Sequence, residues 1–442
     1  MLWRRSHSAD GKRSGANWNM NGKAWAVDES MRSRLQQRTL WILAISQIFG
    51  TIGVGVAPSI GILLAEEVTS SEAWAGLART ASTLGAALLG LPLGNLAARF
   101  GRRIALTSGW WLAALGALLL VPAAQFQLVI PLFVGLLLIG SGSAISLQAR
   151  FAATDLATDD HKGRSLALIV WVGTIGTVLG PNLGIPAQRI SDATGLYVYA
   201  GAFLIAGVAM LVAGLLVFLL MRPDPLLLNR ETDQLVGAAL PVRQRGVLKR
   251  FALELRNNSR ARYAVVAILS AQVVMVAIMT MTPIHLTHHG GSVTLVGVTI
   301  SLHILGMYAL APVVGYVADR WGYRFSIATG LAILAASLLA GGLHPQNMGW
   351  IMASLILLGV GWSFINVSGS ALFATVISKQ DRASVQGGVD ALSNLCGATA
   401  AFAAGPLMAI SSFSALTAIA GLLLIPLVLM TVAAPKAGAL KG

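Results

Sequence analysis

Three side chains that can carry a charge lie inside long apolar stretches of the 442-residue chain: Arg79, His303 and Asp390. A charge in such a stretch costs free energy, so residues of this kind often serve a function. Asp390 lies four residues from both Gln386 and Asn394, which places the three on one face of a helix. A carboxyl group or an imidazole in such a place can take up and release a proton. Asp390 and His303 are therefore our candidate proton-coupling residues.

Each of these residues also has a structural interpretation. The polar face of Asp390 could hold its helix against a neighbour through hydrogen bonds, and His303 could be a neutral histidine bonded to an adjacent helix. Arg79 shares a helical face with Glu72 and can reach the nearby Glu66. We expect an external salt bridge for Arg79 first and contact with a substrate anion second.

Other polar, methionine and aromatic side chains in apolar stretches are candidates for the lining of a substrate cavity. Adaptable side chains of this kind suit a cavity that takes different compounds, although they equally suit ordinary helix packing. The candidates are Gln47, Arg79, Asn182, Gln272, Met275, Phe364, Asn366 and Asn394.

Three histidines, His285, His288 and His289, lie close together in the segment HLTHHGG. No acid or cysteine accompanies them there, so we expect an exposed polar loop and no metal site. The single cysteine, Cys396, cannot form an intrachain disulfide. No Walker phosphate loop, metal-binding helix motif or nucleophile elbow is present, so we expect no cofactor, no use of ATP and no enzymatic activity.

The composition of the chain is that of a membrane protein. Apolar residues make up 56% and charged residues 11%, and the mean hydropathy is +0.74. Stretches of about 20 apolar residues, long enough to cross a bilayer, follow one another from Thr39. We expect an all-α fold with twelve transmembrane helices at residues 40–64, 73–98, 104–123, 127–149, 165–185, 197–221, 262–284, 293–318, 325–343, 348–377, 385–408 and 413–434.

The lysines and arginines indicate how these helices are oriented. Of the 31 basic residues, 29 lie in the two terminal segments and in every second connection, which leaves only Arg79 and Arg189 elsewhere. Basic residues mark the cytoplasmic side of a membrane protein, so both termini are expected there. Topology and anionic lipid account for the net charge of +14 without any need for nucleic acid.

Two short basic segments, GNLAARFGRR at 94–103 and GYVADRWGYR at 315–324, are copies of one another. They are 221 residues apart, half the length of the chain, which indicates a duplicated six-helix unit. The alignment pairs Gly94 with Gly315, Gly101 with Gly322, Arg99 with Arg320 and Arg103 with Arg324.

The repeated segment resembles the loop signature of the major facilitator superfamily, which that family carries between helices 2 and 3 and again between helices 8 and 9. The resemblance covers roughly residues 39–434. It implies two pseudo-symmetric six-helix bundles whose loops form a charged gating latch on the cytoplasmic side. The expected latch residues are Gly94, Arg99, Gly101, Arg102, Arg103, Asp155, Gly315, Asp319, Arg320, Gly322 and Arg324. Because Ala98 stands where the second copy has Asp319, we expect the first copy to be weaker.

A second segment, GTVLGPNLG at 176–184, resembles a helix 5 signature of the family's proton-coupled drug exporters. Proline removes a backbone hydrogen bond and kinks a helix, while glycine allows close packing. We therefore expect a gate at Gly176, Gly180, Pro181 and Gly184. A further glycine often follows in that signature, whereas this chain has Ile185. Helix 1 offers Gln47 and not the acid that those exporters often carry, which leaves the route of the proton open.

The resemblance implies a secondary transporter that works by alternating access, with proton-coupled export of a small, mostly apolar compound as the leading function. Uptake by proton symport or facilitated diffusion is the alternative within transport. A receptor or assembly factor without transport is the alternative of another class.

The expected organisation follows from the same assignments. It comprises a cytoplasmic tail at 1–38, bundles at 39–221 and 262–434 joined by a cytoplasmic linker at 222–261, and a second tail at 435–442. The expected partners are the substrate, protons and the lipid of a bacterial inner membrane, and the chain is expected to be a monomer.

Overall fold

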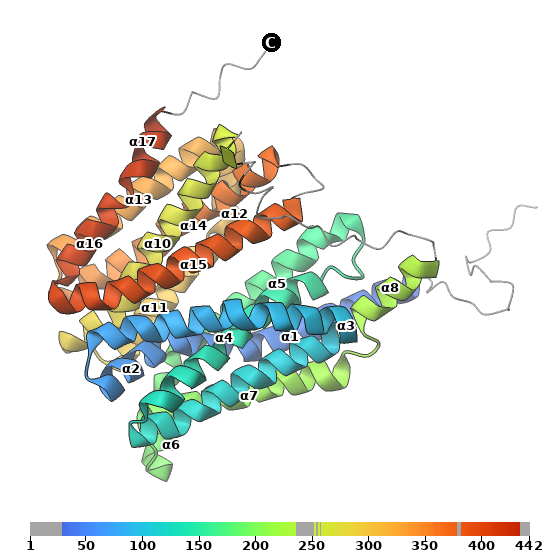
Figure 1. Ribbon diagram of the computed structural model, residues 1–442, viewed down its shortest axis with the longest axis horizontal. Helices are drawn as coiled ribbons and strands as arrows, with labels where there is room; N and C mark the ends of the chain where they lie inside the picture. The colour runs from blue at the N-terminus through green and yellow to red at the C-terminus, as the bar shows by residue number, and fades with distance from the viewer. Residues whose placement is uncertain (1–28, 236–251, 253–254, 257, 378–381, 434–442) are drawn as a thin grey trace, which may run out of the picture.

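The computed structural model describes residues 29–235, 252, 255–256, 258–377 and 382–433 (Figure 1). Within these ranges every regular element is a helix. The first half contains α1 (Glu29–Val56), a π-turn (Ala57–Gly61), α2 (Ile62–Thr69), α3 (Glu72–Phe126), α4 (Val129–Ala152), α5 (Asp159–Leu179), a 3₁₀ turn (Gly180–Leu183), α6 (Gly184–Thr194) and α7 (Val198–Leu220).

The second half is reached through α8 (Pro225–Leu235). It contains α10 (Ser259–His288), α11 (Val293–Tyr308), α12 (Ala311–Trp321), α13 (Tyr323–Leu343), α14 (Met348–Val376), α15 (Arg382–Ile410), α16 (Phe413–Leu422) and α17 (Ile425–Ala433). We refer to α1–α7 as the N-terminal bundle and to α10–α17 as the C-terminal bundle.

Eleven helical stretches within the described residues are long and apolar enough to cross a membrane, so the chain is a multi-pass membrane protein. One of them, α3, has 55 residues and contains both predicted spans 73–98 and 104–123. A straight helix of that length would measure about 80 Å, far more than the ~30 Å core of a bilayer. The backbone of α3 is not helical at Gly101, where φ is 88° and ψ is 174°, and the chain bends there.

The first helix begins earlier than the sequence predicts. Residues 29–38, assigned above to the N-terminal tail, are part of α1 because their side chains bond the ends of other helices. Gln36 donates to the carbonyl of Ala153 at 2.7 Å, and Arg38 donates to that of Leu220 at 3.1 Å. The remainder of the predicted tail lies outside the described residues, as do the C-terminal tail and residues 236–251, 253–254 and 257 of the linker.

Each bundle has a core of its own. The first contains the buried Trp110 and Phe203, and the second contains the buried Ile365. Leu63 and Ala75 belong to the N-terminal bundle by sequence but pack in the second core, so the bundles touch there. The bundles meet where α3 lies along α15 and α2 lies near α10, and in Figure 1 they diverge toward the end at which α5 begins.

Candidate functional site

The contacts between the bundles lie at one end of the molecule. We call this the outer end, after the predicted topology; it carries the connections at 70–71, 195–197 and 289–292. On α3, the Thr80 hydroxyl donates to the carbonyl of Ala398 on α15 at 3.0 Å. At Gly76 a Cβ atom would lie 2.4 Å from the carbonyl oxygen of Ala401, so only glycine allows the two helices to approach this closely.

The predicted helix 5 gate lies in this contact region. Gly176 and Gly180 pack against the backbone of α1, and Pro181 begins the 3₁₀ turn that separates α5 from α6. Asn182 donates to the Ser301 hydroxyl of α11 at 2.6 Å. Asn182, predicted to line the substrate cavity, therefore lies in the contact between the two bundles. The 3₁₀ turn brings it next to α11.

The repeated basic segments lie at the opposite end, and their bonds stay within one bundle each. Arg102 forms two hydrogen bonds to Asp155, at 2.8 and 3.1 Å. Arg103 donates to the carbonyl of Phe218 at the end of α7. Its counterpart Arg324 donates to the carbonyls at the end of α17, including that of Thr431 at 2.9 Å. The arginine of each copy thus binds the C-terminal end of the last helix in its own bundle.

Other predicted latch residues make no contact between the bundles. A Cβ atom at Gly94 or Gly315 would meet nothing within 4 Å, so the close approach expected there is absent from this conformation. Arg99 lies over the ring of Phe100. Asp319 and Arg320 form no hydrogen bond or ion pair with any other described residue. The physical reason is that the bundles diverge at this end.

A group of polar and aromatic side chains of the C-terminal bundle has Arg79 of the N-terminal bundle as an electrostatic neighbour. Arg79 of α3, which is partly buried, interacts electrostatically with Tyr308 and His303 of α11. The Tyr308 ring lies edge-on to Trp362 of α14 with centroids 5.9 Å apart, and Trp362 donates to Gln272 of α10 at 3.0 Å. Gln272, a predicted cavity residue, is therefore linked to Tyr308 through the Trp362 ring.

A second guanidinium faces the same tyrosine. Arg150, near the end of α4, interacts electrostatically with Tyr308. Its Nε atom is buried and has no hydrogen-bond partner among the described residues. No carboxylate within the described ranges forms a salt bridge with Arg79 or Arg150. Tyr308 thus has two positive charges in its electrostatic surroundings.

His303 is fully buried between α11 and α14. Its Nδ1 atom lies 2.7 Å from the carbonyl oxygen of Leu355, which can only accept, so Nδ1 carries the proton. In the neutral ring Nε2 is then an acceptor, and it has no partner among the described residues. A Cβ atom at Gly359 would lie 2.3 Å from the His303 carbonyl, so this glycine lets α14 pack against the histidine.

Asp390 and Asn394 are exposed on α15. Continuing their spacing of four residues leads to Ala398, whose carbonyl accepts the bond from Thr80. The predicted polar face is therefore the one that α15 turns toward the N-terminal bundle. The side chain of Gln386 lies outside the described residues.

The remaining cavity candidates do not gather at one place. Gln47 is buried beside Ser146, which accepts its amide hydrogen bond. Met275 is buried in the second core, while Phe364 packs against Gly330 of α13 inside its own bundle. Asn366 is half-buried on α14. A sequence pattern leaves the orientation of each helix about its own axis undetermined. Only packing decides which face of a helix meets the interface.

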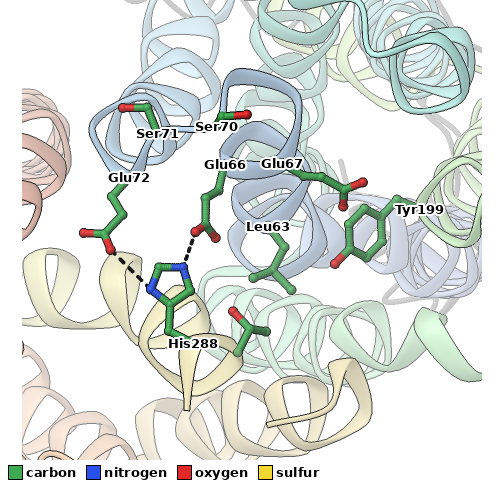
Figure 2. Close-up of a pocket in the computed structure, with 9 residues that line it drawn as sticks. Leu63, Glu66, Glu67, Ser70, Ser71, Glu72, Tyr199 and His288 are labelled. Carbon is green, nitrogen blue, oxygen red and sulfur yellow. Dashed lines mark hydrogen bonds and ion pairs between the residues drawn. The ribbon is translucent and has the colours of Figure 1, made fainter. Parts of the chain in front are cut away.

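The expected external salt bridge of Arg79 is wrong. At the outer end the acids contact His288, which forms ion pairs with Glu66 and Glu72 (Figure 2). These three residues line a cavity of about 630 Å³ together with Glu67 and other side chains. The histidine segment was expected to be a plain exposed loop, so its role as a contact between bundles was missed. The acids at 66–72 and the histidines at 285–289 lie on one side in the predicted topology, which was the available signal.

The other two histidines and a tyrosine complete this region. His285 is buried and stacks on Phe413, with ring centroids 4.3 Å apart. The Tyr197 hydroxyl donates to Glu67 at 2.6 Å. Burial raises the pKa of Tyr197, and the hydrogen bond to Glu67 raises it further, so this hydroxyl stays protonated.

These features, two helical bundles that touch at one end and carry the same arginine contact at the other, define a transporter of duplicated architecture. The chain belongs to the Major Facilitator Superfamily, whose model matches it twice, over residues 40–291 and 263–441. This confirms the resemblance inferred from the repeated segments. The protein is accordingly a membrane transporter and not an enzyme.

Similar proteins extend over nearly the whole chain. The uncharacterized MFS-type transporter YddS of Bacillus subtilis is 37% identical, covering 90% of this chain and 92% of that protein. The uncharacterized MFS-type transporter YdeG of the same organism is 38% identical, covering 89% of this chain and 92% of that protein. The riboflavin transporter RfnT of Brucella anthropi is 29% identical, covering 89% of this chain and 96% of that protein.

Two solved structures share the fold. A bacterial homolog of the human lysosomal transporter Spinster superposes with a TM-score of 0.62, covering 91% of this chain and 94% of its own. A POT family transporter in complex with 5-aminolevulinic acid superposes with a TM-score of 0.65, covering 89% and 96%. Both are 16% identical to this chain.

Proposed function

We propose that this protein is a proton-coupled exporter of a small, mostly apolar compound that carries an anionic group. It works by alternating access, with binding between residues 39–221 and 262–434 and with residues 222–261 as the linker. We count twelve crossings, because α3 bends at Gly101 and so supplies two. The membrane is a bacterial inner membrane, and both termini lie in the cytoplasm.

The observation that carries the proposal is the position of Arg79 and Arg150. Each guanidinium interacts with Tyr308, and neither forms a salt bridge with a described carboxylate. A charge on a membrane helix that no opposite charge balances costs free energy, so an anion between the bundles would offset that cost. Tyr308 and Trp362 supply apolar surface beside the charges.

The conformation of the chain supports alternating access. In the predicted orientation the outer end is closed and the bundles diverge toward the cytoplasm, which corresponds to an inward-facing state. A compound from the cytoplasm would enter from that side. Reorientation then requires the outer contacts around Gly76 and Asn182 to separate.

Proton coupling is assigned to Asp390, with His303 as the second candidate. Asp390 lies on the face of α15 that is turned toward the N-terminal bundle, so its charge can favour one orientation of the bundles over the other. His303 is held by Leu355, and a proton on its free Nε2 would add a donor inside the C-terminal bundle.

A second candidate function is the transport of a neutral planar compound. The riboflavin transporter RfnT is similar along most of the chain, and the edge-on Tyr308 and Trp362 rings suit a planar aromatic ligand. Riboflavin itself is the probe for this alternative.

Proteoliposome assays test these proposals. We expect uptake of 2-naphthoate into inverted vesicles when the lumen is acidic, with the neutral 2-naphthamide and the cationic 2-naphthamidine moving more slowly. Equal movement of the three compounds would contradict an anionic substrate. Movement of naphthoate in the same direction as the proton would indicate symport and contradict export. Transport of riboflavin without transport of naphthoate would favour the second candidate.

A further inference from the structure

A histidine held between two carboxylates joins the bundles at the outer end. His288, the last residue of α10, contacts Glu66 of α2 through Nε2 and Glu72 of α3 through Nδ1, the latter at 3.3 Å. Figure 2 shows the ring between the two acids. Since α10 belongs to the C-terminal bundle and α2 and α3 to the N-terminal bundle, this contact requires a closed outer end.

The two contacts determine how many protons the cluster must hold. A neutral imidazole has one N–H group and can donate to one carboxylate only. Its other nitrogen then presents a lone pair to the second carboxylate, and the two acceptors repel. One additional proton, on the ring or on either carboxyl group, supplies the missing donor. The closed geometry therefore holds one proton more than the fully deprotonated cluster.

The neighbouring titratable groups do not supply this donor. Glu67 of α2 accepts from the Tyr197 hydroxyl, and Tyr199 of α7 lines the same cavity. On α10, the His285 ring is bonded to a backbone carbonyl, and His289 donates to the carbonyl of His285 at 2.8 Å. No lysine or arginine is among the described residues that line the cavity.

We propose that His288, with Glu66 and Glu72, is a proton-binding site that couples the pH of the outer solution to closure of the outer end. The inference rests on the alternating-access function proposed above and adds a proton site separate from Asp390. Closure gains stability when the cluster holds the additional proton and loses it as the pH rises and that proton leaves. With one coupled proton, the ratio of closed to open molecules changes by up to about tenfold per pH unit.

The test measures a distance between the bundles without any substrate. Spin labels at Ala193→Cys in the last turn of α6 and Ser411→Cys directly after α15, both exposed at the outer end, are placed in a Cys396→Ser background in lipid nanodiscs. We expect the short-distance population to fall as the pH is raised from 5 to 9. His288→Gln should lower it at every pH, because an amide cannot take up the proton. His288→Lys should keep it high across the range, because the ammonium stays charged.

A neighbouring histidine provides the matched control. His289→Gln should retain the wild-type pH dependence, because that ring contacts no carboxylate among the described residues. A pH dependence that survives in His288→Gln, or that is unchanged in His288→Lys, overturns the proposal. Both variants must elute as the wild type does on size exclusion. If the distances respond as expected while no compound is transported, the proposed function fails and the proton site stands.

Discussion

Gly101 and Gly322, which occupy matching positions in the two repeated segments, adopt nearly the same unusual backbone conformation. Their φ angles are 88° and 89°, and their ψ angles are 174° and 154°. This region is open to glycine almost alone, because a Cβ atom clashes with the backbone there. The duplication is therefore preserved as a backbone bend between consecutive membrane helices.

We expect Gly322→Ala to destabilise the protein by about 1–3 kcal/mol, the usual cost of a strained backbone conformation. Backbone strain is the whole cost there, because the added Cβ would meet no other atom within 4 Å. Gly101→Ala should cost more, because its Cβ would lie 2.4 Å from the Asp224 carboxylate. Thermal unfolding in detergent measures both. Gly315→Ala, inside α12 with open space around it, is the control and should unfold no earlier than the wild type. Equal unfolding temperatures for all three would contradict the backbone argument.

Gly76→Ala should prevent the outer end from closing. The added Cβ would lie 2.4 Å from the Ala401 carbonyl oxygen and 3.1 Å from the backbone nitrogen of Gly405, and backbone atoms cannot move aside cheaply. The outer spin-label distance should lengthen at every pH. Gly90→Ala, on the same helix but with its nearest neighbour at 3.7 Å, should leave that distance unchanged. A closed outer end in Gly76→Ala would show that the helices do not need this contact.

The pair of Arg102 and Asp155 should contribute measurable coupling within the N-terminal bundle. Their side chains are 15% and 11% exposed, so two charge-assisted hydrogen bonds form away from most of the water. A double-mutant cycle with Arg102→Ala and Asp155→Ala should give about 1–3 kcal/mol of coupling in unfolding free energy. A coupling near zero would show that solvent screens the pair despite its burial.

Arg79→Gln should remove the preference for anionic compounds, while Arg79→Lys should keep part of it, because lysine retains the charge but not the planar guanidinium. The ratio of 2-naphthoate to 2-naphthamide transport measures this preference. Arg189→Gln, an exposed arginine at the outer end, is the control and should behave as the wild type. If Arg79→Gln keeps the wild-type ratio, the charge of Arg79 does not select the substrate.

Asp390→Asn should abolish coupling to the pH gradient while leaving exchange of substrate across the membrane intact, because the amide keeps the shape of the side chain but takes up no proton. Counterflow and gradient-driven transport in proteoliposomes separate the two activities. Asp192→Asn, an exposed acid on α6, is the matched control. Gradient-driven transport by Asp390→Asn would remove this residue from the coupling mechanism and leave His303 as the candidate.

The sequence alone was sufficient for the fold class and the family. Both were indicated by apolar runs of bilayer length, basic residues in alternate connections and a repeat at 221 residues. These features are local or periodic, so they can be recognised without knowledge of packing. The matched positions of Gly101 and Gly322 are visible in the sequence, whereas their positive φ angles are seen in the structure. The helix 5 motif likewise predicted an interruption of the helix at Pro181, and α5 ends just before it at Leu179.

Tertiary structure decided which of these residues meet. Arg79 was expected beside Glu72, yet its electrostatic neighbours are Tyr308 and His303 of α11, while Glu72 contacts His288. A helical pattern states which residues share a face but not which neighbour that face contacts, and the ion pair between residues 66 and 288 joins segments 222 positions apart. Packing between two bundles, which no local pattern encodes, therefore placed the charges at the interface.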